Sequence, residues 1–193
     1  MTIYNINLGI GWASSGVEYA QIYRARLFRS VSLDAKFIFM DFISSDNIEH
    51  LTRNIGFKDS EVIWLYQYFT DVEIAPTTYT LAHVLGGFDR EPLEIIRNPE
   101  NKTFRVIFGD NDFVTCYASD MDNELIDRAE IVSRGCLIQK EYYTYVKNFV
   151  EYYSPVDGRA RLYQRTWLNE DGSVAYEEII DEVNGKQETQ IYR

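Results

Sequence analysis

The sequence predicts an α/β region followed by an antiparallel β-meander. Three observations support this fold class. A glycine-bearing turn separates an alternating apolar run from a helical run near the start, and residues 36–43 (KFIFMDFI) read as a strand buried on both faces. Beyond residue 88, short β-like runs recur about every ten residues between clusters of turn residues. We therefore expect the α/β region at residues 1–88 and the meander at residues 89–193.

The first βαβ unit is expected over residues 3–43. Residues 2–8 alternate in polarity, which is typical of a strand. Residues 17–31 repeat apolar side chains at three- and four-residue intervals, which predicts an amphipathic helix. Its predicted apolar face comprises Val17, Ala20, Tyr23, Leu27, Phe28 and Val31. Its predicted solvent face carries Arg24, Arg26 and Arg29. The strand at residues 36–43 completes the unit.

Further elements follow from caps and turns. The expected helices are residues 48–54 after Ser45 or Asp46, residues 61–69 after Ser60, and residues 81–85 after Thr80. The expected strands are residues 93–97, 103–108, 113–119, 124–133, 161–168, 175–181 and 189–193. Residues 141–153 (EYYTYVKNFVEYY) could form a helix by length, but we assign them to a strand because aromatic side chains favour sheets.

Composition excludes several functions. The formal net charge of −11 and the pI near 4.6 argue against a nucleic-acid partner, because phosphate backbones require a basic surface. Two separated cysteines and two isolated histidines predict no metal site and no metal cofactor. The N-terminus lacks a signal-peptide pattern and no apolar run approaches about 18 residues, so we expect a cytoplasmic protein.

The stretch Gly9–Tyr19 (GIGWASSGVEY) is the candidate functional element. Glycines let a backbone come close to a ligand, and a helix N-terminus offers unpaired N–H groups to an anion. Ser15 and Glu18 match a capping box, so we expect the Glu18 carboxylate to turn back onto the Ser15 amide. Without further context, a purely structural βα turn is the more frequent meaning of such a motif.

The α/β region contains two clear strands, whereas a nucleotide-binding Rossmann sheet has five or six. A parallel sheet cut at that point would leave an apolar edge exposed. We therefore expect the chain to be the N-terminal part of a Rossmann domain from a longer protein, with the meander as an insertion.

Several segments together resemble a known family. They are YNINLGIGWASSGVEYAQIYRARLFR, KFIFMDFISSDNIEHLTRNIGF, VIWLYQYFTDVEIAPTT, FVTCY and LYQRTWLNEDG. They are similar to retaining bacterial GT-B glycosyltransferases, and in particular to the A subunit of the accessory Sec system glycosyltransferase. The resemblance covers nearly the whole chain. It implies transfer of N-acetylglucosamine (GlcNAc) from UDP-GlcNAc to serine and threonine hydroxyls of a serine-rich repeat adhesin.

The resemblance also implies partners and a place of action. A homologous B subunit would join the complex, and the meander would serve subunit contact and acceptor binding, with self-association as a further use. The enzyme would need no cofactor and no metal. It would act in the cytoplasm, at the periphery of the inner membrane face.

Carried over residue by residue, the donor-sugar loop of the family falls on Gly16, Val17, Glu18 and Tyr19. Ser14 and Ser15 would lie beside the diphosphate and the acceptor hydroxyl. No catalytic residue is expected in this chain, because the family's other active-site groups lie in later segments. Glu170 and Glu178 match the spacing of the family's E-x7-E motif, but they flank a predicted hairpin turn, so we interpret the match as coincidence. The chain alone should therefore not transfer sugar.

Two alternatives stay open from the sequence. The chain could be a non-catalytic interaction module in which the meander docks the acceptor. It could instead belong to a related glycosyltransferase that modifies teichoic acid. Binding of UDP would distinguish an enzyme part from a module, whereas the choice of acceptor is not encoded in residues that we can identify.

Overall fold

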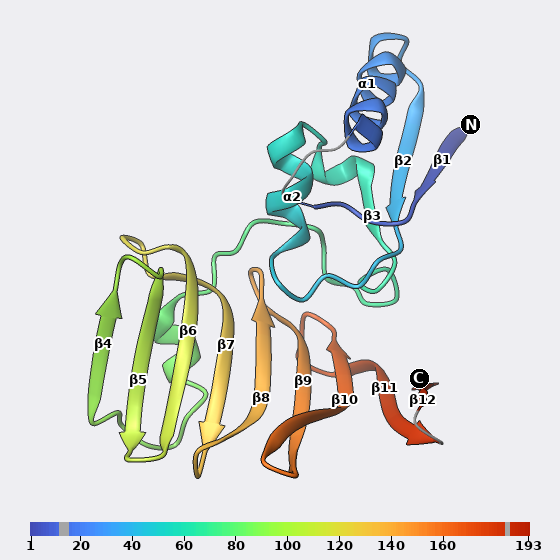
Figure 1. Cartoon of the computed structure of the whole chain (residues 1–193). Helices are drawn as coiled ribbons and strands as arrows, with labels where there is room; N and C mark the ends of the chain where they lie inside the picture. Colours follow the sequence, from blue (N-terminus) through green and yellow to red (C-terminus); the bar gives the residue numbers. More distant parts are fainter. Residues whose placement is uncertain (12–15, 184–185) are drawn as a thin grey trace. The chain divides into compact units, whose positions relative to one another are not determined.

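The computed structural model describes residues 1–11, 16–183 and 186–193. Side chains are described for all of these residues except those within 182–187. The structure divides the chain into two compact units, residues 1–76 and 77–193 (Figure 1). The first unit contains β1 (Thr2–Asn7), α1 (Gly16–Ser30), β2 (Asp34–Phe39), α2 (Ile48–Ile55), a 3-10 turn (Asp59–Glu61) and β3 (Val62–Trp64). The second contains α3 (Leu81–Leu85) and nine strands.

The first unit confirms the βαβ prediction and adds a third strand. Its three strands are parallel and lie in the order β1-β2-β3. The expected helix over residues 61–69 is wrong, because residues 62–64 pair with β2 and the chain then turns. Val62 and Trp64 are buried against the sheet. A three-residue strand is too short to show a periodic pattern, so its β-branched and aromatic composition was the available signal.

Helix α1 exists where expected, but its buried face differs from the prediction. Ile22 and Ala25 are buried, whereas Val17, Tyr23, Leu27 and Val31 are exposed. Ile22 packs close to Gly56 at the end of α2. Arg29, expected in solvent, lies on the packed side and pairs with Glu61 at 3.0 Å. The apolar spacing therefore identified the helix but assigned the wrong stripe to this unit's core.

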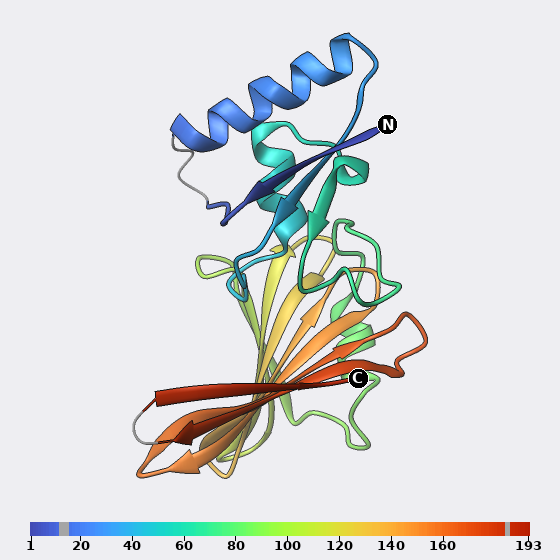
Figure 2. The ribbon, with the colours of Figure 1, turned by 90° about the vertical axis from the view of Figure 1, so that its right-hand side faces the viewer.

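The second unit confirms the meander. Its strands are β4 (Glu94–Asn98), β5 (Thr103–Gly109), β6 (Asp112–Asp120), β7 (Leu125–Ser133), β8 (Cys136–Tyr143), β9 (Lys147–Val156), β10 (Arg159–Leu168), β11 (Val174–Val183) and β12 (Lys186–Tyr192). They form one sheet in sequential order, and each neighbouring pair is antiparallel. Figure 2 shows the strong twist of this sheet.

The turns of the meander account for its register. Arg134 and Gly135 have φ angles of 51° and 76°, and Asp157 and Gly158 have 50° and 74°. Two consecutive residues with positive φ are the signature of a type I′ hairpin turn, which matches the twist of the flanking strands. The aromatic stretch at residues 141–153 is β-structured as expected, but it forms parts of β8 and β9 rather than one strand. The turn between them lacks glycine and proline, so no sequence signal marked it.

Helix α3 belongs to the meander rather than to the α/β region. Leu81 and Val84 are buried in one cluster with β-strand residues such as Phe104, Val106 and Ile126. The Leu81 amide also donates to the Glu124 carbonyl at 2.9 Å. The compact units therefore divide between Pro76 and Thr77, whereas the sequence placed the boundary at residue 88. A five-residue helix that packs on the sheet is the physical reason for the difference.

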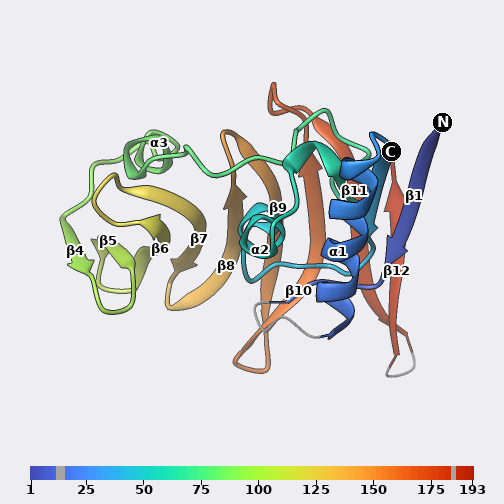
Figure 3. The ribbon, with the colours of Figure 1, turned by 90° about the horizontal axis from the view of Figure 1, so that it is seen from above.

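The sheet of the first unit carries exposed apolar side chains. Figure 3 shows α1 and α2 on the same side of β1, as right-handed crossovers require when strands are added in one direction. Tyr4, Ile6 and Leu8 are exposed on and just after β1. Parallel sheets are normally covered on both faces. An exposed apolar face of this kind is what the expected larger Rossmann domain would cover.

Candidate functional site

The glycine turn begins at the carboxyl end of β1 and leads into α1. Gly16, Val17, Glu18 and Tyr19 form the first turn of the helix. Ser14 and Ser15 lie outside the described residues, so the predicted Ser15 part of the capping box does too. In open α/β sheets, ligands bind beyond the carboxyl ends of the strands. The predicted donor-sugar residues are therefore in the position that the fold uses for ligands.

Glu18 turns back toward the start of the turn. Its Oε1 atom accepts a hydrogen bond from the Gly11 amide at 3.1 Å. The expected hydrogen bond to the Ser15 amide lies outside the described residues, and the Gly11 amide is a described partner of Glu18. A carboxylate in the first helical turn also interacts favourably with the positive end of the helix dipole. Glu18 therefore ties the two ends of the turn together.

Asp41 lies so close to Gly9 that a larger residue at position 9 would clash with it. The sequence did not predict this contact. A Cβ atom at residue 9 would lie 2.8 Å from Oδ2 and 3.0 Å from Cβ of Asp41. The Asp41 amide donates to the Leu8 carbonyl at 2.6 Å, which holds residues 40–41 against the end of β1. Asp41 follows β2, so the carboxyl ends of β1 and β2 meet here. Gly11 and Gly16 have no comparable clash.

A cavity of about 220 Å³ lies beside this turn. It is lined by Ile6, Asn7, Leu8, Gly9, Val17, Glu18, Gln21, Phe39, Ile55 and Phe57. The described lining residues include one carboxylate and no basic side chain. Backbone amides of the helix start can contact an anion, but the positive side chains that neutralise a diphosphate would have to come from elsewhere.

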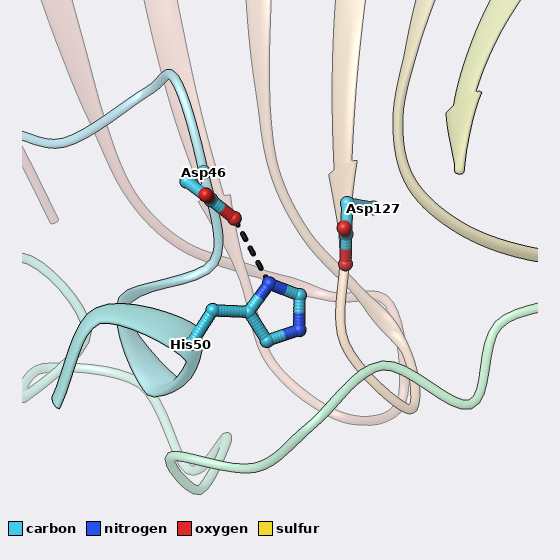
Figure 4. Close-up of side chains that lie close together, drawn as sticks. All are labelled: Asp46, His50 and Asp127. Atoms are coloured by element: carbon cyan, nitrogen blue, oxygen red, sulfur yellow. Dashed lines mark hydrogen bonds and ion pairs between the residues drawn. The ribbon is translucent and has the colours of Figure 1, made fainter. Parts of the chain in front are cut away.

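The two histidines have local partners. His50 Nδ1 lies 2.9 Å from Asp46 Oδ1 on the turn before α2 (Figure 4). Asp127, which Figure 4 also labels, belongs to the second unit. His83 Nδ1 accepts from the Thr80 amide at 3.1 Å and completes the N-terminal cap of α3. Both histidines are helix residues, as expected.

The E-x7-E match is a structural coincidence within the meander. Glu170 is exposed in the β10–β11 turn and accepts a hydrogen bond from the Tyr145 hydroxyl. Glu178 is buried in β11 and pairs with Arg165 at 3.4 Å. The two carboxylates have different surroundings and different partners. The two carboxylates therefore do not face a common site, as the two glutamates of a catalytic motif would.

Arg165 is the centre of a buried polar cluster. Its Nε atom lies 3.0 Å from Oε1 of Glu151, and Oε2 of the same carboxylate accepts hydrogen bonds of 2.8 Å from the hydroxyls of Tyr142 and Tyr153. Burial and the neighbouring Glu151 carboxylate raise the pKa of both tyrosines above the ordinary value of 10.0. Arg165 therefore pairs with carboxylates on both neighbouring strands.

Lys140 also pairs with a carboxylate across strands. Lys140 Nζ lies 3.2 Å from Glu130 Oε1 on the neighbouring strand. Opposite charges facing each other across a strand pair stabilise a sheet modestly.

Among the described residues, no helix is long and apolar enough to cross a membrane.

The fold defines a class: a short parallel α/β unit joined to a long antiparallel sheet. Residues 96–193 match the family model of the GtfA extended beta-sheet domain, and the chain belongs to this family. It is 54% identical over 189 residues to the UDP-N-acetylglucosamine–peptide N-acetylglucosaminyltransferase GtfA subunit of Streptococcus pneumoniae serotype 4. That match covers 97% of this chain and 37% of the relative, so the chain spans a little over a third of the curated relative's length.

Two solved structures share this architecture at high identity. One is the pneumococcal O-GlcNAc transferase GtfA in complex with UDP and GlcNAc, with a TM-score of 0.91 and 51% identity. The other is a GtfA/B complex, with a TM-score of 0.90 and 49% identity. Each match covers all of this chain and 38% or 39% of the solved chain.

Proposed function

We propose that this chain forms the first part of a retaining glycosyltransferase. The enzyme transfers GlcNAc from UDP-GlcNAc to serine or threonine hydroxyls of a serine-rich repeat adhesin. The observation that carries the proposal is the match over the whole chain, at 51% identity, to a GtfA structure that holds UDP and GlcNAc. The glycine turn at the carboxyl end of β1 supports it, because this is where an α/β sheet binds a nucleotide.

The start of α1 supplies the donor-binding wall. Gly16, Val17, Glu18 and Tyr19 present backbone amides and the positive end of the helix dipole, which favours the diphosphate as UDP leaves. Ser14 and Ser15 are proposed beside the diphosphate and the acceptor hydroxyl. Glu18 keeps the turn folded through the Gly11 amide. The basic groups of the site would come from another part of the protein, so this chain alone should be inactive.

The transfer should need neither a metal nor a cofactor. No pattern of metal ligands accompanies the proposed donor loop in the sequence. The full-length enzyme should therefore transfer GlcNAc at the same rate with and without EDTA. A rate that falls with EDTA and returns with Mg²⁺ or Mn²⁺ would contradict this.

The meander is proposed as the surface for a homologous B subunit and for the acceptor polypeptide. The likeness to a chain solved in a GtfA/B complex supports the subunit contact. We further infer a role in the accessory Sec system, on the cytoplasmic side and at the periphery of the membrane. Peptide acceptors are favoured over teichoic acid because the relative at 54% identity is named as a peptide N-acetylglucosaminyltransferase.

The second candidate is a non-catalytic interaction module. It is favoured by the cavity's lack of described basic side chains and by the carboxylate that already occupies the Gly11 amide. The two functions differ in UDP binding. In the module, UDP would not bind, while the B subunit or a serine-rich peptide still would.

Calorimetry with UDP on the full-length protein tests the proposal. Gly16→Asp places a second carboxylate at the helix start, where a Cβ meets no atom within 4 Å, so the fold should tolerate it. Ala20→Asp adds the same charge one turn further along the exposed face of α1. We expect Gly16→Asp to abolish UDP binding and Ala20→Asp to retain most of it. Equal binding by both variants would contradict the donor-loop assignment.

A further inference from the structure

A cavity of about 390 Å³ lies along the outer edge of β3 (Figure 1), and its volume is typical of a small-molecule site. All described residues that line it belong to segment 59–74 of the first unit. In the doubly wound order of a Rossmann sheet, β3 is the outer strand and further strands add beside β1. A larger domain would therefore leave this edge of the sheet open.

Residues 70–74 line the cavity on the side away from β2. They are held by Gln67, whose Nε2 atom donates to the carbonyls of Val72 and Glu73 at 2.9 and 3.0 Å. The Thr70 hydroxyl also accepts a hydrogen bond of 3.2 Å from the Val72 amide. Because these residues occupy the outer side of β3, the cavity suits a small ligand rather than an added strand.

Two hydrogen-bond acceptors of the lining are available to a ligand. Gln67 is only 5% exposed, and within the described residues no group donates to its Oε1 atom. The Leu65 amide donates to the Phe39 carbonyl at 2.9 Å, so the alternation of the parallel ladder turns the Val62 carbonyl toward the outer edge. A buried acceptor costs free energy until a donor reaches it. The ligand should therefore bring hydroxyl or amide hydrogens.

The charges of the lining argue against an anion. The lining contains two carboxylates, Asp59 and Glu73, and its described residues include no basic side chain. Asp59 already accepts a hydrogen bond of 2.9 Å from Arg53. A phosphate or carboxylate ligand would thus find no cation to compensate it. The hydroxyls of Ser60 and Tyr68, which can donate or accept, suit a neutral ligand with several hydroxyl groups.

Tyr68 adds an aromatic surface to these polar groups. Its side chain is 62% exposed, and the ring of Phe69 meets it edge to face at 5.4 Å between centroids. The face of an aromatic ring is negative, so it attracts the partly positive C–H groups on one side of a sugar ring. An exposed ring beside carboxylate, amide and hydroxyl groups is the chemistry that recognises a pyranose.

We propose that this cavity binds a neutral sugar residue. The identity of the sugar rests on the proposed function: it is a GlcNAc that an earlier transfer has attached to the acceptor. The cavity is separate from the donor turn, which follows β1 on the far side of β2. A serine-rich acceptor offers many hydroxyls, and a hold on one modified residue keeps the acceptor bound while another is modified.

Saturation-transfer NMR on the full-length protein tests the sugar site, with free GlcNAc as the probe and Gly16→Asp as the background that removes the donor site. We expect magnetisation transfer to GlcNAc. Tyr68→Ala should reduce it about fivefold, and Tyr68→Phe should retain most of it because the ring remains. Tyr192→Ala, which removes a tyrosine of similar exposure from β12, should leave it unchanged. No transfer to GlcNAc, or equal losses in Tyr68→Ala and Tyr192→Ala, would overturn the proposal.

Spermidine as the probe distinguishes a cation site. If spermidine gives a signal that depends on Tyr68 and GlcNAc gives none, the two carboxylates bind a cation and the proposal is wrong.

Calorimetry tests the identity of the sugar. In the presence of saturating UDP, a serine-rich peptide that carries one GlcNAc should bind the otherwise unaltered protein more tightly than the unmodified peptide, and Tyr68→Ala should remove the difference. Equal affinities for the two peptides, together with a Tyr68-dependent GlcNAc signal, would support a sugar site but contradict the glycosylated acceptor as its ligand. Failure of the proposed function is read separately, from UDP binding by the wild type and by Gly16→Asp.

Discussion

A Cβ atom at residue 9 would lie 2.8 Å from Oδ2 of Asp41, so Gly9 and Asp41 can hold their positions only while residue 9 is glycine. This contact joins the ends of β1 and β2 directly below the turn that leads into α1. The proposed donor site therefore depends on a contact between two strands as well as on its own glycines.

Gly9→Ala should destabilise the protein by about 1–3 kcal/mol, because an added methyl group in a tightly packed place forces the backbone to shift. Gly16→Ala is the matched control, since a Cβ there meets nothing within 4 Å. It should change the free energy of unfolding by less than about 1 kcal/mol. Urea unfolding measures both. Asp41→Ala should partly restore the Gly9→Ala variant, and an absence of any recovery would show that the clash lies elsewhere.

Glu18→Gln should strengthen UDP binding about two- to fivefold, because it removes a negative charge near the diphosphate while an amide oxygen can still accept from Gly11. Glu18→Ala loses the Gly11 hydrogen bond as well and should weaken binding relative to Glu18→Gln. Calorimetry compares the dissociation constants. Weaker UDP binding by Glu18→Gln than by the wild type would mean that the carboxylate itself contacts the donor.

Arg165→Met should cost about 3–5 kcal/mol of stability, because it leaves the buried Glu151 and Glu178 carboxylates without their common cation. Lys140→Met, which removes a more exposed partner of Glu130, should cost about 1 kcal/mol or less. Denaturant unfolding is followed by the fluorescence of Trp167, which is buried in the meander, in a background with Trp12 and Trp64 replaced by Phe. Similar costs for the two variants would contradict the central role of Arg165.

The stability of the meander should fall above pH about 10, the ordinary tyrosine pKa. Burial raises the pKa of Tyr142 and Tyr153 in the folded state, so the unfolded chain loses these protons first. Their contribution is complete below pH about 10 and is lost as the pH rises through the folded pKa values. The double variant Tyr142→Phe, Tyr153→Phe should be less stable at pH about 8 but should show a shallower decline between pH about 9 and about 11. An unchanged slope would contradict the assignment.

Native thiol labelling should distinguish the two cysteines. Burial raises the pKa of the Cys116 thiol to about 12, and the thiolate is the reactive form. Cys136 is half-buried at the start of β8. A thiol reagent at pH about 8 should therefore modify Cys136 and leave Cys116 until the meander unfolds. Rapid modification of Cys116 in the folded protein would show that its core opens readily.

The sequence predicted the order of elements better than their contacts. Turn clusters with glycine marked the meander because few residues tolerate a positive φ, such as the 80° of Gly172. Strand β3 was missed because three residues carry no period, and the β8–β9 turn because it lacks glycine and proline. The exposed stripe of α1 was taken for a core face because apolar spacing does not tell which partner covers it.

The glycine turn in the sequence indicated where the candidate site lies, but the sequence did not predict the geometry of that site. The approach of Asp41 to Gly9 and the Gly11–Glu18 hydrogen bond depend on segments that meet only in the folded sheet. Ser14 and Ser15 lie outside the described residues, so their proposed place beside the diphosphate stays a prediction.

Transfer of labelled GlcNAc from UDP-GlcNAc to a serine-rich peptide by the full-length protein with its B subunit tests the central claim most directly. The wild type and Ala20→Asp should transfer the sugar with retention, and Gly16→Asp should lose at least about tenfold in rate, because its carboxylate faces the diphosphate. No transfer by the wild-type complex, or equal rates for the two aspartate variants, would contradict the account.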